Sequence, residues 1–144
     1  MLTVDTIENG TVVDHIRAGM GRKVLYLMGI DQNYPHRVAL MINVPSKKMG
    51  KKDILKIEGI LVSDEKTNLI ALVSPKATVN HIQGGKVVKK SQAELPERIC
   101  GVGKCPNPKC ITNAEKVQSR FAMEPGDGYR CGYCERRFAA SELV

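Results

Sequence analysis

The chain has 144 residues, of which 42% are hydrophobic and 26% charged, and its formal net charge is +7. This length accommodates one ordinary domain, or a domain of roughly 100 residues followed by a small module stabilised by a metal. No apolar run of about 18 residues occurs, which argues against a membrane-spanning helix. Residues 1–10 lack the basic start and apolar run of a secretory signal, so we expect a cytoplasmic protein with no membrane association.

In chain order, the hydrophobic pattern predicts strand, helix, two strands, helix and two strands. The strands are expected at residues 11–16, 37–44, 53–62, 77–82 and 86–91, and the helices at 20–29 and 63–73. Gly84-Gly85 is typical of the tight turn of a hairpin between the last two strands. This order is similar to a ferredoxin-like split βαβ domain with an added edge strand. The predicted class is therefore α+β, with an antiparallel sheet.

In two of these strands, the alternation of residues predicts which side chains share a face. Val38, Leu40, Ile42 and Val44 would share one face of the strand at 37–44, which Pro45-Ser46 would end. In the strand at 53–62, Leu55, Ile57 and Leu61 would share one face, and Lys52 and Lys56 would lie about 13 Å apart on the other.

Four cysteines near the C-terminus carry the strongest local signal. Cys105 and Cys110 form a C-x4-C pair, and Cys131 and Cys134 form a C-x2-C pair after a further twenty residues. Two short knuckles joined by a hairpin of this length bring four thiolates around one ion, which predicts a closed structural Zn²⁺ site, one per chain, with no coordination position for a substrate. Two disulfides, a rubredoxin-type iron site and unrelated thiols are the alternatives. Cys100 is expected to be a small core residue outside this set.

Lysines gather in two groups before residue 95. The groups are Lys47, Lys48, Lys51, Lys52 and Lys56, then Lys86, Lys89 and Lys90. A solvated face explains any single lysine, whereas two groups in one small domain favour a polyphosphate site. The sequence contains no G-x-S-x-G, H-E-x-x-H or P-loop motif, so we expect a binding or regulatory chain rather than an enzyme.

Short segments along nearly the whole chain resemble the regulatory subunit of aspartate carbamoyltransferase. These segments are GTVVDHI (10–16), MGKKDILKIE (49–58), ATVNHI (77–82), VVKKS (87–91), LPERI (95–99), CPNPKCI (105–111) and CGYCE (131–135). The resemblance implies a nucleotide-binding allosteric domain at residues 1–92 and a small, mostly β zinc domain at 93–144. CTP would inhibit, ATP would activate, and UTP could act alongside CTP.

The resemblance also implies the partners. The zinc domain would dock on catalytic chains, which perform the reaction that opens pyrimidine synthesis. Regulatory chains would form homodimers through the first domain, and three such dimers would bridge two catalytic trimers into a dodecamer.

The family's nucleotide site maps onto this chain residue by residue. Asp14 and Lys56 match ribose contacts, His15 and Lys90 match positions near the phosphates, and Lys52 matches a residue linked to phosphates and to a second nucleotide. The remaining matches are apolar walls at Ile7, Val12, Ile82 and Val87 and a polar neighbour at Asn80. Gly85 stands where members of the family can carry an aromatic that touches the base.

Two other functions remain open at this point. A nucleic-acid-binding zinc ribbon would need a basic ribbon and stacking aromatics, but aromatics make up only 4% of the chain and there is no Trp. We therefore expect no nucleic acid partner. A free-standing ligand sensor without a catalytic partner is the other alternative.

Overall fold

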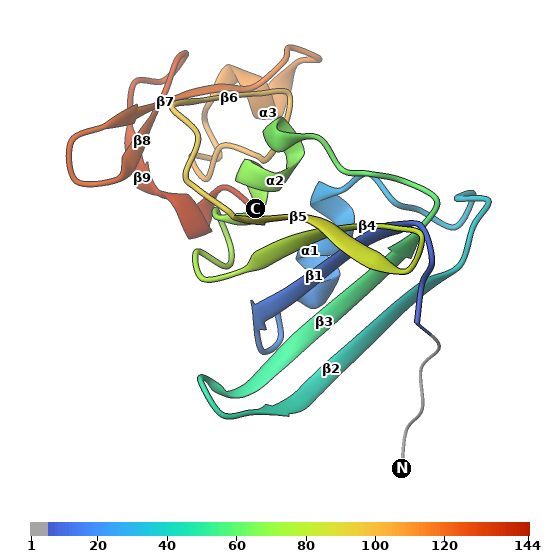
Figure 1. Cartoon of the computed structure of the whole chain (residues 1–144). Coiled ribbons are helices and arrows are strands. Elements are labelled where there is room, and N and C mark those ends of the chain that lie inside the picture. Colours follow the sequence, from blue (N-terminus) through green and yellow to red (C-terminus); the bar gives the residue numbers. More distant parts are fainter. Residues whose placement is uncertain (1–5) are drawn as a thin grey trace. The chain divides into compact units, whose positions relative to one another are not determined.

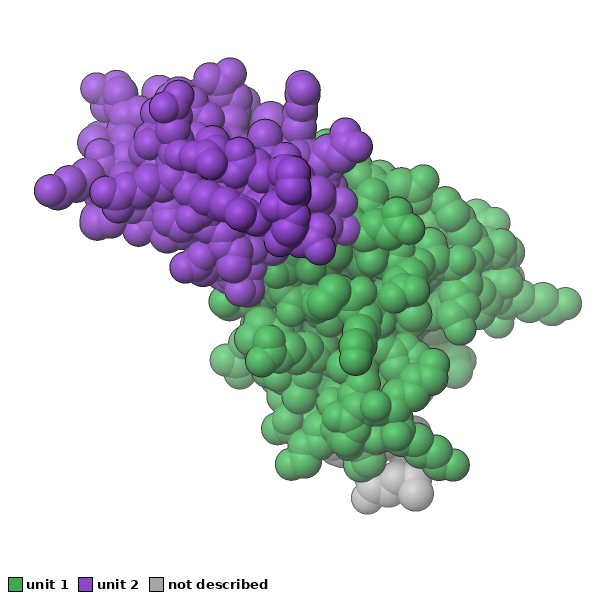
Figure 2. Space-filling model, turned by 90° about the vertical axis from the view of Figure 1, so that its left-hand side faces the viewer, with its two compact units in different colours: residues 1–94 green, residues 95–144 purple. Residues whose placement is uncertain are grey.

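The computed structural model describes residues 6–144, which form two compact units. The first unit extends to Glu94 and the second comprises Leu95–Val144, coloured separately in Figure 2. The division falls two residues after the predicted boundary at 92/93, because Ala93 and Glu94 are still tied to the first unit. The Ala93 amide donates to the Ala77 carbonyl, and the Glu94 amide donates to the Asn68 side chain.

The first unit is built around a five-stranded antiparallel sheet in the order β2-β3-β1-β4-β5 (Figure 1). Its strands are β1 (Gly10–Arg17), β2 (Val38–Ser46), β3 (Gly50–Glu58), β4 (Thr78–Gln83) and β5 (Lys86–Gln92). Helix α1 (Gly21–Leu27) follows β1, and α2 (Asp64–Ile70) follows β3. The first four strands and both helices have the ferredoxin-like order, and β5 is the added edge strand, as the sequence predicted.

One face of this sheet is buried and the other is largely open. The buried face is formed by Val13, Leu55, Ile57 and Val79, together with the inward side chains Val24, Leu27 and Ile70 of the two helices. Helix α1 begins directly against this face, since a side-chain carbon on Gly21 would lie 2.9 Å from Asp53 Oδ2 and 2.7 Å from Leu40 Cδ1. The alternate residues of the strands therefore lie on the face that the helices leave uncovered.

Three predicted elements end earlier than expected. Strand β3 ends at Glu58 because Gly59 turns with a φ of +88°, so Leu61 is 43% exposed and does not share the core face with Leu55 and Ile57. Helix α1 is shorter than the expected 20–29, and α2 ends at Ile70 rather than near residue 73. Ser63 caps α2 as expected, accepting a hydrogen bond from the Lys66 amide.

The alternation predicted for the strand at 37–44 is broken by a β-bulge. The pairing of β2 with β3 skips from Met41 to Val44, and Asn43 adopts a φ of 62°. Ile42 is consequently 43% exposed. The strand also continues through Pro45 and Ser46 instead of ending there, because β2 is an edge strand and can tolerate a proline.

The second unit contains a four-stranded antiparallel sheet in the order β6-β7-β8-β9. Its elements are β6 (Arg98–Cys100), α3 (Ile111–Ala114), β7 (Arg120–Glu124), β8 (Gly128–Cys131), β9 (Arg137–Ala139) and a 3₁₀ turn at Ala140–Glu142. Ile99 points into the core, so its neighbour Cys100 points outward and is exposed. The expectation that Cys100 is a core residue is therefore wrong.

The whole chain is an α+β protein with antiparallel sheets and a small β module, which confirms the predicted class. Among the described residues, no helix has the length and apolar character needed to cross a membrane.

Candidate ligand site and metal centre

A row of predicted ligand-binding residues crosses the open face of the first sheet. Val12 on β1 pairs with Lys56 on β3 on one side and with Asn80 on β4 on the other, and Asn80 pairs in turn with Lys90 on β5. Residues paired in this way share one face of a sheet. Four residues that are far apart in the sequence are therefore aligned across three neighbouring strand pairs.

A second group of polar residues lies farther along β1, where its pairing with β3 is irregular between Val13 and Ile16. Asp14 and His15 occupy this bulge, and His15 adopts a φ of 55°. Lys52 Nζ lies 2.9 Å from Asp14 Oδ1. The His15 amide donates to the same carboxylate oxygen at 2.6 Å, and the His15 ring nitrogen Nδ1 lies 3.0 Å from the Thr78 hydroxyl.

The Asp14 carboxylate has an environment that favours its charged form. Burial would raise its pKa, but hydrogen bonds from Lys52 and from the His15 amide, together with the charge of Lys52, outweigh burial and lower the pKa from its ordinary value. An ionised carboxylate beside ammonium groups suits a ligand that carries both hydroxyl and phosphate groups.

The apolar members of the predicted site lie toward the other end of the strands. Ile82 on β4 pairs with Val87 on β5, which is 58% exposed. Ile7 precedes β1 and lines a pocket of about 680 Å³, within the size range of small-molecule sites. Gly85 lines the same pocket, and a side-chain carbon at Gly85 would meet open space.

The hairpin turn beside this pocket is fixed by the segment before β1. Gly84 and Gly85 both have positive φ, as a type I′ turn requires. The Gly85 amide donates to the Glu8 carbonyl, and the Gly84 amide donates to the Asn9 side chain. All ten predicted ligand residues thus lie on the open face or at its pocket end.

The sequence analysis did not identify Asp53 as an important residue. Asp53 is fully buried and accepts hydrogen bonds from three backbone amides. The signal that could have found it is an acidic residue at an inward position of an apolar strand, between Lys52 and Leu55.

The four predicted metal ligands meet at one point of the second unit. The Sγ atoms of Cys105, Cys110, Cys131 and Cys134 all lie within 4.8 Å of one another. Two of the separations, Cys105–Cys134 and Cys110–Cys131, are 3.7 Å. Four sulfurs bound at about 2.3 Å to a tetrahedral ion lie about 3.8 Å apart, so the cluster has the dimensions of a closed metal site. All four cysteines are free, so the two-disulfide alternative does not apply.

The chemistry of the cluster also favours a bound cation. A hydrogen bond from the Thr112 hydroxyl to Cys110 Sγ, at 3.1 Å, lowers the pKa of Cys110 to about 6 and favours the thiolate, which is the form that binds metal. Burial raises the pKa of Cys105 to about 12, so its thiolate needs the charge of an ion to form. Four thiolates in this space are therefore stable only around a metal.

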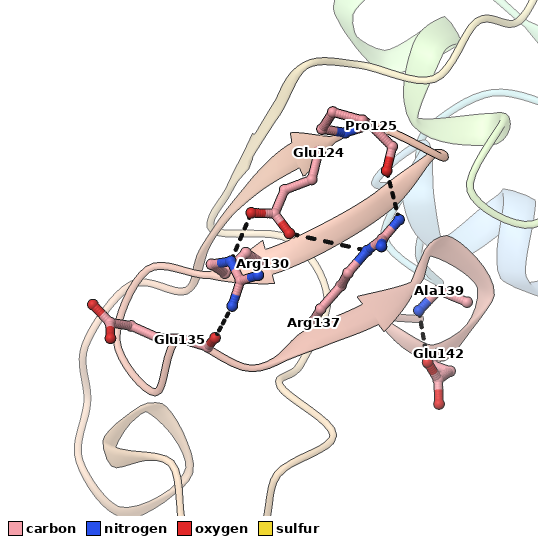
Figure 3. Close-up of polar contacts among 7 residues, drawn as sticks. All are labelled: Glu124, Pro125, Arg130, Glu135, Arg137, Ala139 and Glu142. Atoms are coloured by element: carbon pink, nitrogen blue, oxygen red, sulfur yellow. Dashed lines mark hydrogen bonds and ion pairs between the residues drawn. The ribbon is translucent and has the colours of Figure 1, made fainter.

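The sheet beside the metal site is cross-linked by Glu124 (Figure 3). Its carboxylate oxygens lie 2.6 Å from Arg130 Nε on β8 and 3.9 Å from Arg137 Nε on β9. Arg137 also donates to the Pro125 carbonyl at 2.8 Å. This ion-pair network was not predicted from the sequence. It joins three strands, and both of its arginines are paired with a carboxylate of the same module.

The fold and the site define a class of protein: a chain with an antiparallel α+β domain that presents a polar open face, followed by a small β domain with a four-cysteine metal site. The family model described as "Aspartate carbamoyltransferase regulatory chain, allosteric domain" matches residues 2–94, and the model described as "Aspartate carbamoyltransferase regulatory chain, metal binding domain" matches residues 97–144. The chain belongs to the family of aspartate carbamoyltransferase regulatory chains. It is therefore a regulatory chain and not a catalytic one.

Curated relatives are similar in sequence to this chain over almost its full length. The aspartate carbamoyltransferase regulatory chain of Methanococcus maripaludis is 50% identical over 137 residues, which are 94% of this chain and 91% of the relative. That of Pyrococcus horikoshii is 48% identical over 146 residues, covering 99% and 96%. The resemblance identified from short segments is confirmed.

Proposed function

We propose that this chain is the non-catalytic subunit that makes an aspartate carbamoyltransferase responsive to nucleotides. CTP would bind the first domain as inhibitor and ATP as activator, with UTP a further effector. The observation that carries this proposal is the row Val12, Lys56, Asn80 and Lys90, aligned across the open sheet face beside the Asp14–Lys52 pair.

Each part of the face suits one part of a nucleoside triphosphate. Asp14 accepts hydrogen bonds from ribose hydroxyls, with Lys56 nearby. His15 and Lys90 give charge-assisted hydrogen bonds to phosphates, as does Lys52, which also approaches a second nucleotide. The base occupies the pocket end, between apolar walls. These walls are Ile7, Val12, Ile82 and Val87, with Asn80 as a polar neighbour.

We propose that the metal of the second domain is Zn²⁺, one ion per chain, held by Cys105, Cys110, Cys131 and Cys134. Four protein thiolates fill a tetrahedral shell and leave no position for a substrate, so the ion stabilises the fold. The domain that it holds together (residues 93–144 by sequence, Leu95–Val144 by structure) is the part that docks on catalytic chains.

In the proposed assembly, each domain makes a different contact. Two regulatory chains pair through their first domains, and three such dimers bridge two catalytic trimers into a dodecamer in the cytoplasm. An exposed edge strand such as β2 is one surface available for pairing. No nucleic acid takes part, which is supported by the engagement of Arg130 and Arg137 with Glu124.

The decisive experiment is to reconstitute the chain with its catalytic chains and to measure activity against aspartate concentration with and without CTP, ATP and UTP. A nucleotide-dependent shift of the curve is expected. No shift with any nucleotide, although the subunits assemble, would refute the regulatory proposal. Failure to bind catalytic chains would favour a free-standing sensor.

A further inference from the structure

Asp53 occupies an unusual position for a carboxylate. It lies on β3 with 0% of its surface exposed, on the face that the helices cover. Its Oδ2 accepts hydrogen bonds from the amides of Gly19, at 3.0 Å, and Gly21, at 2.9 Å. Its Oδ1 accepts one from the Asn43 amide, at 3.1 Å. A polar group of this kind is kept in a protein interior only where hydrogen bonds satisfy it.

These three amides belong to two segments on opposite sides of β3. Gly19 lies in the loop that leaves β1 and Gly21 is the first residue of α1, whereas Asn43 lies in the bulge of β2. Asp53 therefore clamps both neighbouring strands to the middle of β3. Asn43 needs such an anchor, because a φ of 62° is uncommon for a residue with a side chain.

The clamp lies directly beneath the polar group of the open face. Ile16 pairs with Asp53, so the bulge that displays Asp14 and His15 ends at this residue. Lys52 precedes Asp53 in the strand, and successive side chains point to opposite faces. Fixing Asp53 inward thus directs Lys52 outward, where its ammonium lies 2.9 Å from Asp14.

We propose that Asp53 is a positioning residue for the phosphate-binding part of the ligand site. It touches no ligand itself; it holds β3 against the two bulges so that Lys52 and His15 are placed together before an anionic ligand arrives. This inference rests on the proposed binding of nucleoside triphosphates. It predicts that a change at Asp53 affects the triphosphate group selectively and spares the nucleoside.

The test is Asp53→Asn in the full-length chain, with CTP and cytidine as the two probes in calorimetry. Asparagine keeps the size of the side chain but has one carbonyl oxygen for three donors, so one side of the clamp is released. We expect CTP affinity to fall by about 10- to 100-fold, by analogy with the loss of metal affinity when a hydrogen-bond partner that orients a metal ligand is removed. By the same measurement, the affinity for cytidine should change by less than about twofold, because cytidine has no phosphates for Lys52 and His15 to contact.

A double-mutant cycle separates positioning from general weakening. If Asp53 acts through Lys52, the loss of CTP affinity from Asp53→Asn should largely disappear in a Lys52→Ala background, because coupled residues are not additive. Thr11→Val is the control: Thr11 is also fully buried and bridges the Ile60 carbonyl and the Val62 amide. It should destabilise the unit and leave the ratio of CTP to cytidine affinity unchanged.

Gly19→Ala tests the same clamp if Asp53→Asn does not fold. Gly19 has a φ of +92° with open space around it, so alanine strains the turn that presents its amide without a steric clash. The CTP-to-cytidine ratio should again fall. Equal losses for both probes, or additive losses in the cycle, would show that Asp53 is only a folding anchor. A wild-type chain that binds no CTP would refute the proposed function and this inference with it.

Discussion

At the scale of single residues, the Asp14–Lys52 pair has two tasks. The ammonium lies 2.9 Å from the carboxylate, and their side chains are 16% and 27% exposed, for Lys52 and Asp14 respectively. Without ligand, the ion pair holds the Lys52 side chain in place. In the proposed nucleotide site, Lys52 would share its three donors between Asp14 and a phosphate, so the site would be organised before binding.

The lowered pKa of Asp14 predicts how stability depends on pH. Its pKa is lower in the folded chain than in the unfolded chain, so the unfolded state binds more protons at acidic pH. The stabilisation is fully present above the unfolded value of about 3.9 and is lost as pH falls through the folded value. In urea unfolding between about pH 2 and 7, Asp14→Asn should be less stable than the wild type at neutral pH, and the two should converge in acid. A constant difference across this range would contradict the pairing.

Lys89 and Lys90 offer a matched comparison, since neighbouring residues of a strand point to opposite faces. Lys90 pairs with Asn80 on the open face, whereas Lys89 pairs with His81 and makes an ion pair with Asp64 on α2. Lys90→Ala should weaken CTP binding by roughly 10- to 150-fold, the equivalent of losing a hydrogen bond to a charged group. Lys89→Ala should lose only a surface ion pair and bind CTP normally. Calorimetry on both variants decides whether the open face holds the phosphates.

At the scale of elements, the sequence predicts regular features well and irregular ones poorly. Strand order, the Gly84-Gly85 hairpin and the four-cysteine cluster follow from alternation, turn chemistry and ligand spacing, which are local properties. The bulges at His15 and Asn43 cannot be predicted in this way, because their left-handed residues contact Thr78 on β4 and Asp53 on β3 respectively. The outward direction of Cys100 likewise depends on the register of β6, which a three-residue strand does not reveal.

The metal module should unfold without its ion. Zinc binding in small modules supplies about 10–16 kcal/mol of apparent free energy, more than a 50-residue unit gains from its core. Chelation, or Cys131→Ser, should abolish the protection of amides in residues 95–144 from hydrogen exchange and leave residues 6–94 protected, since the units have separate cores. Cys100→Ser is the control, because Cys100 is exposed and outside the cluster, and it should retain one metal ion per chain. Loss of metal in that variant would overturn the ligand assignment.

At the scale of the whole molecule, the proposed function assigns nucleotide binding to the first unit and docking to the second. The predicted nucleotide residues all lie before residue 95 and the cysteine cluster lies after it. Nucleotide binding alone changes no equilibrium: regulation requires that the nucleotide bind two states of the assembly with unequal affinity. Under the proposed function the response therefore depends on both units, and we expect a variant of one unit to leave the activity of the other intact.

This separation predicts that two variants of the full-length chain each lose one property, nucleotide response or assembly, and keep the other. The Lys56→Ala/Lys90→Ala variant should assemble with catalytic chains as the wild type does, because the metal unit is untouched, and its activity should no longer change with CTP or ATP. Cys131→Ser should bind CTP with normal affinity and fail to assemble, because the docking unit is unfolded. Sedimentation would measure assembly, calorimetry would measure binding, and activity against aspartate would report regulation. If the lysine variant still responds to CTP, the effector site lies elsewhere, and if the cysteine variant still assembles, the catalytic chains dock on the first unit.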